Sequence, residues 1–272
     1  MCIRDSLFPS PAVGVPFTDT LGVAVPDHLA IVRGAGSYLT GRAREHAASR
    51  IQFPGLFQDE SGRDTIAKFG AVKQMLAEME AQRILVETLS LLDPGPQDDA
   101  WTGAAVRKIL AADAFGPQPG SFSYNAGQVF GGTAFSEDDC LAKYYRDSSP
   151  FRFLIAHDDV LRTEIGRRRL EAVSAGASLI PVSLQEEAWL EALREEGLFS
   201  DIVVRWEGAC SEIEAWAVDA TSHIDSDSKH ADLVSFHAGN VTARALGIKA
   251  CILRSGWRLE CGLSVKATLE AT

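Results

Sequence analysis

The feature that most constrains this chain is a stripe of apolar residues with helical spacing in its first third. The stripe recurs at intervals of three, four and seven residues and consists of Ile66, Phe69, Val72, Leu76, Met79, Val86 and Leu89. This spacing places all of these side chains on one face of a helix of about seven turns. Nowhere do two segments of alternating polarity flank a hairpin turn. We therefore predict an all-α fold.

Similar periodicity predicts helices along most of the chain. Pro26 suits the first position of a helix over 27–52, and Asp64 or Thr65 suits the N-cap of the long helix that follows. Further helices are expected at 101–115, 123–130, 136–146, 158–174, 200–222 and 229–254. Glutamates crowd 186–196, where the composition changes. We expect an irregular lead-in over 1–22, then two successive helical bundles at 23–176 and 183–272.

The composition excludes several classes of function. Lys and Arg total 26 against 37 Asp and Glu, and the formal net charge of −11 disfavours binding to nucleic acid. No uncharged apolar stretch is long enough for an integral membrane segment. The five cysteines form no CxxC pair, and no secretory signal opens the chain. We expect a cytoplasmic protein with free thiols and no bound metal.

Three short strings carry the functional information. The first is Arg-Ile-Gln-Phe-Pro-Gly at 50–55, and the second is Gln-Val-Phe-Gly-Gly at 128–132. The third begins with Tyr-Tyr-Arg-Asp at 144–147 and leads to Asp-Val-Leu-Arg at 159–162. Taken singly, an arginine that ends a helix compensates the helix dipole, and a Gly-Gly pair caps a helix or admits a phosphate.

In this order, the strings resemble those of the C-terminal helical domain of the acyl-CoA dehydrogenase family, over about residues 25–170. The resemblance implies an up-and-down four-helix bundle that contacts FAD and assembles as a homodimer or homotetramer. It implies an oxidoreductase acting on CH–CH bonds, which desaturates an acyl-CoA substrate and passes electrons to a flavoprotein acceptor. The extension at 183–272 resembles the extra helical domain of longer members, which supports dimers and in some members associates peripherally with membranes.

The resemblance also assigns cofactor contacts residue by residue. Arg50 corresponds to the arginine that touches the FAD diphosphate of a neighbouring subunit, and Phe53 would pack nearby. Gln128, Gly131 and Gly132 correspond to the string that lines the adenine-diphosphate end of the flavin. A guanidinium suits this task because its fork binds two phosphate oxygens at once.

The sequence departs from the family at the catalytic base. Counting from either side of the third string places Ile155 where the family has the glutamate that removes the α-proton. Ala156 and His157 replace the glycine and threonine that follow, and Ala24 occupies the alternative base position of some members. An isoleucine accepts no proton, so the catalytic residue is unknown.

Three explanations stay open for this departure. The base is a displaced carboxylate, with Asp158, Asp159 or Asp27 nearest in sequence, or it is His157, whose ordinary pKa suits proton transfer. Alternatively, the chain has lost desaturation and serves as a non-catalytic helical oligomerisation or binding module. Locally, His157 with the two aspartates also has the pattern of a helix N-cap and an acidic first turn.

Family members carry a helical domain and a β-barrel before this bundle, and the sequence shows neither. We expect the chain to be a fragment of a longer protein, with a non-native start at Met1–Ser6.

Overall fold

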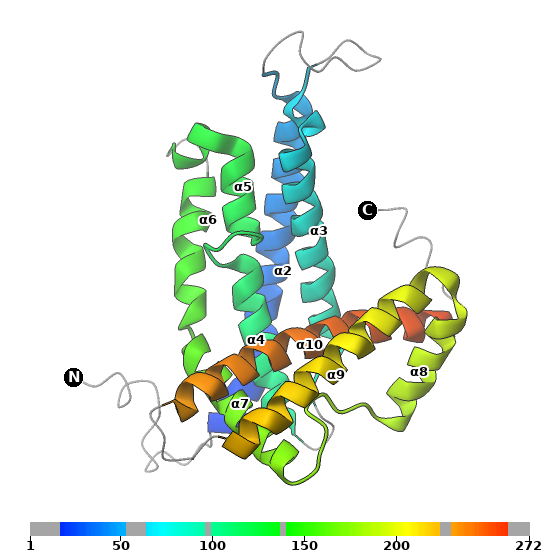
Figure 1. Ribbon diagram of the computed structural model, residues 1–272. Helices are drawn as coiled ribbons and strands as arrows, with labels where there is room; N and C mark the ends of the chain where they lie inside the picture. The colour runs from blue at the N-terminus through cyan, green and yellow to red at the C-terminus, as the bar shows by residue number, and fades with distance from the viewer. Residues whose placement is uncertain (1–16, 53–63, 96–98, 137–139, 224–229, 261–272) are drawn as a thin grey trace, which may run out of the picture. The chain divides into compact units, whose positions relative to one another are not determined.

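The computed structural model describes residues 17–52, 64–95, 99–136, 140–223 and 230–260, and these form helices joined by short connections (Figure 1). No strand occurs within these ranges, where extended backbone pairs at a single bridge between Ile51 and Thr65. The all-α prediction is confirmed. None of the described helices has the length and apolar character needed to span a membrane.

The predicted helices recur in the structure with small shifts at their ends. The α-helices are α2 (Phe17–Ser49), α3 (Gly70–Leu91), α4 (Ala100–Phe115), α5 (Phe122–Phe130), α6 (Leu141–Ser148), α7 (Asp158–Ser174), α8 (Leu184–Glu195), α9 (Gly197–His223) and α10 (Ala231–Glu260). Single 3-10 turns are η2 (Ile66–Lys68), η3 (Gly131–Phe135) and η4 (Ser149–Arg152). The acidic segment forms a helix of its own, α8, whose N-terminus is closed by a capping box between Ser183 and Glu186.

The first helix differs from its prediction at the N-terminus. α2 begins at Phe17, so Pro26 lies inside it, and the irregular lead-in predicted over 1–22 is wrong from residue 17 onward. Residues 1–16 lie outside the described part. Leu21, Val25 and Leu29 are all buried at helical spacing, so the apolar face continues across the proline. Their burial offsets the cost of about 3 kcal/mol for a proline within a helix.

The long helix predicted from residue 66 is preceded by a 3-10 turn. Thr65 is the N-cap of η2 but makes no side-chain cap hydrogen bond, so its predicted capping role is wrong. The bridge to Ile51 explains this, because the Ile66 N–H donates to the Arg50 carbonyl (3.0 Å) and holds Thr65 extended. α3 itself begins at Gly70.

The described residues divide into two compact units. The central unit comprises 28–87 and 111–154, and the C-terminal unit comprises 17–27, 88–110 and 155–260. The units interleave along the chain, because α2, α3 and α4 each supply residues to both. The up-and-down four-helix arrangement and the linear domain boundary stay predictions.

The C-terminal unit is built on a close crossing of α7 and α10. A Cβ atom added to Gly166 would overlap the Ser235 carbonyl, and one added to Gly239 would overlap the Arg162 carbonyl. The two backbones therefore touch where glycines face each other. The Arg162 guanidinium also donates to the Asn240 side-chain oxygen at 2.6 Å, which adds a polar contact to the crossing.

The central unit joins α2 to α3 through a buried carboxylate. Glu80 is 4% exposed and accepts hydrogen bonds from Arg44 (3.1 Å) and from two nitrogens of Arg83 (2.9 and 2.5 Å). The hydrogen bond from Arg83 lowers the pKa of Glu80 despite its burial. α5 is joined to α3 by Asn125, whose amide donates to the Met75 carbonyl (3.2 Å) and to Glu78 (2.9 Å).

We predict that Gly239→Ala lowers the free energy of unfolding by about 1–3 kcal/mol, because the added methyl group forces α7 and α10 apart. Gly208→Ala is the matched control, since a Cβ there meets no atom within 4 Å on α9. It should raise stability by up to about 1 kcal/mol through helix propensity. Urea unfolding followed by circular dichroism measures both, and equal effects would contradict the close crossing.

We predict that Glu80→Gln destabilises the protein near neutral pH and that this loss shrinks in acid. Because the folded-state pKa of Glu80 is lowered, its contribution is present above the unfolded pKa of about 4.3 and disappears as the pH falls through the folded value. Unfolding curves of the original protein and of Glu80→Gln between pH 3 and 7 give the difference in their free energies of unfolding. This pH range includes the ordinary pKa of a glutamate carboxyl group. A difference independent of pH would exclude this linkage.

Candidate cofactor site and base candidates

The helix that precedes the first string contacts the second string within the central unit. The His46 ring in α2 stacks on the Phe130 ring in α5, with centroids 4.1 Å apart and planes inclined by 21°. The Arg42 guanidinium carbon lies 5.9 Å from the centroid of the same Phe130 ring. Arg50 follows His46 by about one helical turn, and Gln128 precedes Phe130 by two residues. The C-terminal ends of α2 and α5, next to which Arg50 and the Gly-Gly pair follow in the chain, therefore lie at the same end of this unit (Figure 1).

Local sequence explains how α5 presents its glycines. Ser121 caps the helix by accepting a hydrogen bond from the Tyr124 N–H (3.2 Å). Gly131 ends it with φ 60°, a left-handed conformation that favours glycine. A Cβ added to Gly132 would meet no atom within 4 Å, so the backbone here is open to approach from outside. The predicted end of the helix at the Gly-Gly pair is confirmed.

The predicted cofactor residues that the structure describes all reach the surface of the central unit. Arg50, Gln128, Gly131 and Gly132 are exposed, whereas Phe53 lies outside the described residues. A guanidinium, an amide and an open glycine backbone are suited to phosphate oxygens. These residues therefore fit the diphosphate of a dinucleotide, bound at an open surface.

Sequence reasoning missed two further basic residues beside this set. Arg42 and His46 lie four residues apart on one side of α2, and Arg50 follows directly after the last residue of this helix. The signal was visible in the sequence as a basic column within a chain of net charge −11. The column adds positive potential next to the strings, as an anion site requires.

An aromatic cluster extends from the same side of α2 toward α6. The Tyr38 ring stacks on Tyr144 (centroids 5.4 Å apart), and its hydroxyl lies 3.0 Å from the Cys140 sulfur. Arg42 donates to the same hydroxyl at 3.2 Å. The hydrogen bond with Cys140 raises the pKa of Tyr38, so the phenol stays protonated at neutral pH.

The base candidates belong to the C-terminal unit, where the chain makes an unusual turn before α7. Ile155, at the position of the family glutamate, has φ 72° and is the one non-glycine residue with positive φ in the described ranges. A β-branched residue in this conformation costs about 1–3 kcal/mol. Ala156, which follows, is buried. The turn thus carries an apolar, strained residue where the family carries a carboxylate.

The local interpretation of His157 and its two aspartates is confirmed. His157 is the N-cap of α7, and its Nδ1 accepts a hydrogen bond from the Asp159 N–H at 3.2 Å. The Asp159 carboxylate lies 3.7 Å from the same nitrogen, and both side chains are partly exposed. Asp27 is exposed on α2. A base role for Asp158, Asp159, His157 or Asp27 stays a prediction.

Asp158 differs from the other candidates because it is completely buried. Its carboxylate forms an ion pair with Lys108 of α4, and both side chains are 0% exposed. The pair gives Asp158 a structural role in joining α7 to α4. The sequence signal was Lys108 itself, which follows Arg107 between Val106 and Ile109 in a helix made mostly of apolar residues.

The predicted cofactor residues and the base candidates therefore fall into separate units, with the former in the central unit and the latter in the C-terminal one. No group of three or more metal-ligating side chains forms in the described ranges. No protein-family model matches the sequence, and no curated protein matches it.

We predict that Asp158→Asn lowers the free energy of unfolding by about 3–5 kcal/mol, because it leaves the Lys108 ammonium buried without a counter-charge. The double variant Lys108→Met/Asp158→Leu removes both charges and should recover most of that loss. Chemical denaturation of the three proteins provides the measurement. If the double variant were no more stable than Asp158→Asn, the loss of stability in Asp158→Asn would not be due to an unpaired buried charge.

Proposed function

We propose that this chain is the FAD-contacting helical part of an acyl-CoA dehydrogenase-like flavoprotein, which oxidises the Cα–Cβ bond of an acyl-CoA thioester. The observation that carries the proposal is the stacking of His46, four residues before the first string, on Phe130 of the second string. Residues more than seventy positions apart are brought to one end of one unit, with their polar groups exposed.

Each residue of this set has a distinct task in the proposal. The Arg50 guanidinium binds two oxygens of the diphosphate, and the Gln128 amide donates one further hydrogen bond. Gly131 and Gly132 let backbone N–H groups approach the anion without a side chain in the way. Arg42 raises the local positive potential. Bound FAD would supply the hydride acceptor for desaturation.

The exposure of the set favours a cofactor shared between two protein surfaces. Arg50, Gln128 and the two glycines lie on the outside of the central unit instead of within an enclosed cavity. A second copy of the protein in a homodimer or homotetramer would cover the other side of the ligand. The family resemblance also implies a shared cofactor, because it assigns Arg50 to the FAD diphosphate of a neighbouring subunit.

Proton removal is assigned to a residue other than the one at the family position. Ile155 carries no base, and the carboxylate of Asp158 is buried against Lys108. His157 and Asp159 keep exposed side-chain atoms at the start of α7, so these two can reach a substrate in solution.

A second candidate function is a non-catalytic helical oligomerisation or binding module. The observation that favours it is the turn at Ile155, where an apolar residue in a strained conformation replaces the family glutamate. In this alternative the basic column still binds an anion or a partner, but no desaturation takes place.

We expect Arg50→Ala and Gln128→Ala each to weaken FAD binding by about tenfold, the loss of one good hydrogen-bonding contact to an anion. Arg205→Ala is the control, because it removes one exposed positive charge from α9 in the C-terminal unit. Quenching of FAD fluorescence by the full chain gives the affinities. Equal affinities in all four proteins would remove the assigned diphosphate contacts.

A second measurement separates the two functions. The FAD-loaded protein is mixed with a panel of acyl-CoA thioesters under anaerobic conditions, and the flavin absorbance is followed. Bleaching would support the dehydrogenase, whereas FAD binding without bleaching by any thioester would favour the non-catalytic module.

A further inference from the structure

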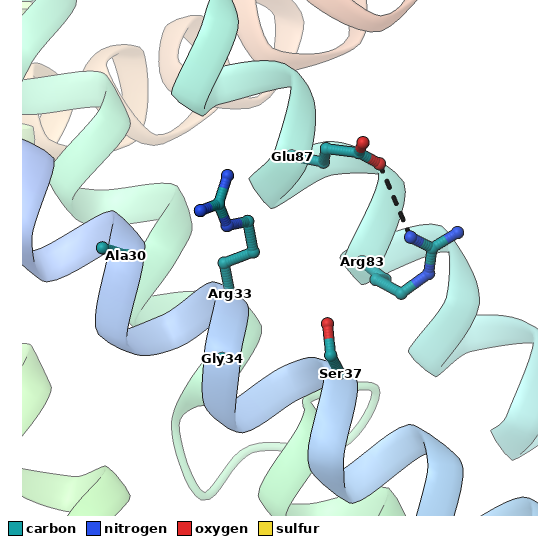
Figure 2. Close-up of a pocket in the computed structure, with 6 residues that line it drawn as sticks. All are labelled: Ala30, Arg33, Gly34, Ser37, Arg83 and Glu87. Carbon is teal, nitrogen blue, oxygen red and sulfur yellow. Dashed lines mark hydrogen bonds and ion pairs between the residues drawn. The ribbon is translucent and has the colours of Figure 1, made fainter.

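A second polar site lies along the side of the central unit, away from the strings. It is a groove of about 380 Å³ between α2 and α3, open to solvent (Figure 2). Its lining consists of Ala30, Arg33, Gly34 and Ser37 from α2, with Arg83 and Glu87 from α3. Arg33 precedes Arg50 by seventeen positions, or about 25 Å along a helix, so the groove is separate from the proposed FAD contacts.

The groove exists because α2 presents small residues to α3 at this level. Ala30, Gly34 and Ser37 recur at intervals of four and three, on one face of the helix. A Cβ atom added to Gly34 would meet no atom within 4 Å, so the floor of the groove is open. The opposing residues of α3 are long and charged and line the groove without filling it.

Arg83 is held in place by its own contacts before any ligand arrives. Its Nε and Nη2 donate to the buried Glu80, and its Nη1 donates to Glu87 at 3.5 Å (Figure 2). These contacts use three of the five N–H donors of a guanidinium. The other two donors stay available in a fixed orientation, which lowers the entropic cost of binding an anion.

Arg33 and Ser37 supply the other donors. Arg33 is exposed, its side chain extends between the two helices in Figure 2, and within the described residues it forms no ion pair or hydrogen bond. The Ser37 hydroxyl points into the same space. Two guanidinium groups and one carboxylate, that of Glu87, leave the lining with a net positive charge.

We propose that this groove binds a small phosphate monoester whose organic part carries an ammonium or hydroxyl group. The three terminal oxygens of a phosphate monoester match the three donor groups of Arg33, Ser37 and Arg83, whereas a carboxylate offers only two oxygens. Glu87 accepts the hydrogen bond from the ammonium or hydroxyl group. A volume of about 380 Å³ is within the range of small-molecule sites and exceeds the need of inorganic phosphate.

The test uses O-phosphoethanolamine, which carries both groups, and titration calorimetry on the full chain. Gly34→Leu fills the floor of the groove, and Arg33→Ala removes one anion contact; both should weaken binding at least about tenfold. Gly41→Leu is the matched control, because it places the same side chain in open space on α2, two turns beyond Gly34 and outside the groove lining. Gly41→Leu should bind O-phosphoethanolamine with the affinity of the original protein.

Inorganic phosphate provides the second comparison. It should bind more weakly than O-phosphoethanolamine, because it offers no group to Glu87. Absence of O-phosphoethanolamine binding at millimolar concentration, or equal binding by Gly34→Leu and Gly41→Leu, would overturn the proposal. Equal affinity for the two ligands would overturn the role of Glu87. None of these outcomes depends on FAD binding at Arg50 and Gln128.

Discussion

The buried carboxylate of Glu80 is the interaction on which the central unit depends. A carboxylate that is almost removed from water must be paired, and Glu80 is paired from both sides, by Arg44 of α2 and by Arg83 of α3. The same contacts hold the two helices together and fix the orientation of Arg83, which is one of the residues that line the groove. The position of α2 also determines where Arg42, His46 and Arg50 stand. Both candidate anion sites of this unit therefore depend on one ionised side chain.

The C-terminal unit uses a second buried ion pair in a different way. Lys108 and Asp158 are fully buried and join α4 to the first turn of α7, directly after the strained turn at Ile155. Replacing both members of a buried pair by apolar residues often costs little stability, whereas removing one member costs much more. Here the pair anchors the start of α7, and the close crossing at Gly166 and Gly239 positions α7 against α10. The strained turn is thus held by packing on its C-terminal side.

The charge distribution links these structural facts to function. The chain as a whole is acidic, yet α2 carries a column of basic side chains and supplies Arg33 to the groove. The net negative charge repels anions at long range, whereas Arg42 of α2 and the guanidinium groups of the groove attract them locally. Small anionic groups such as the phosphates of a cofactor are therefore better suited to the central unit than an extended polyanion. The exposed residues proposed to contact FAD lie near the stacked rings of His46 and Phe130. They are therefore accessible to a ligand and held on a rigid support.

The sequence by itself determined the helices, since the spacing of apolar residues reports which face of each helix is buried. It also located the end of α5 at Gly131, because only glycine readily takes a left-handed backbone there, and the N-cap at His157. It misjudged the start of α2, because local proline chemistry was outweighed by burial of Leu21 and Val25. The tertiary structure alone decided that His46 stacks on Phe130, that Asp158 is buried against Lys108, and that Arg33 and Arg83 line one groove. Periodicity describes one helix at a time, whereas the partner of a buried charge or ring depends on which helices pack together.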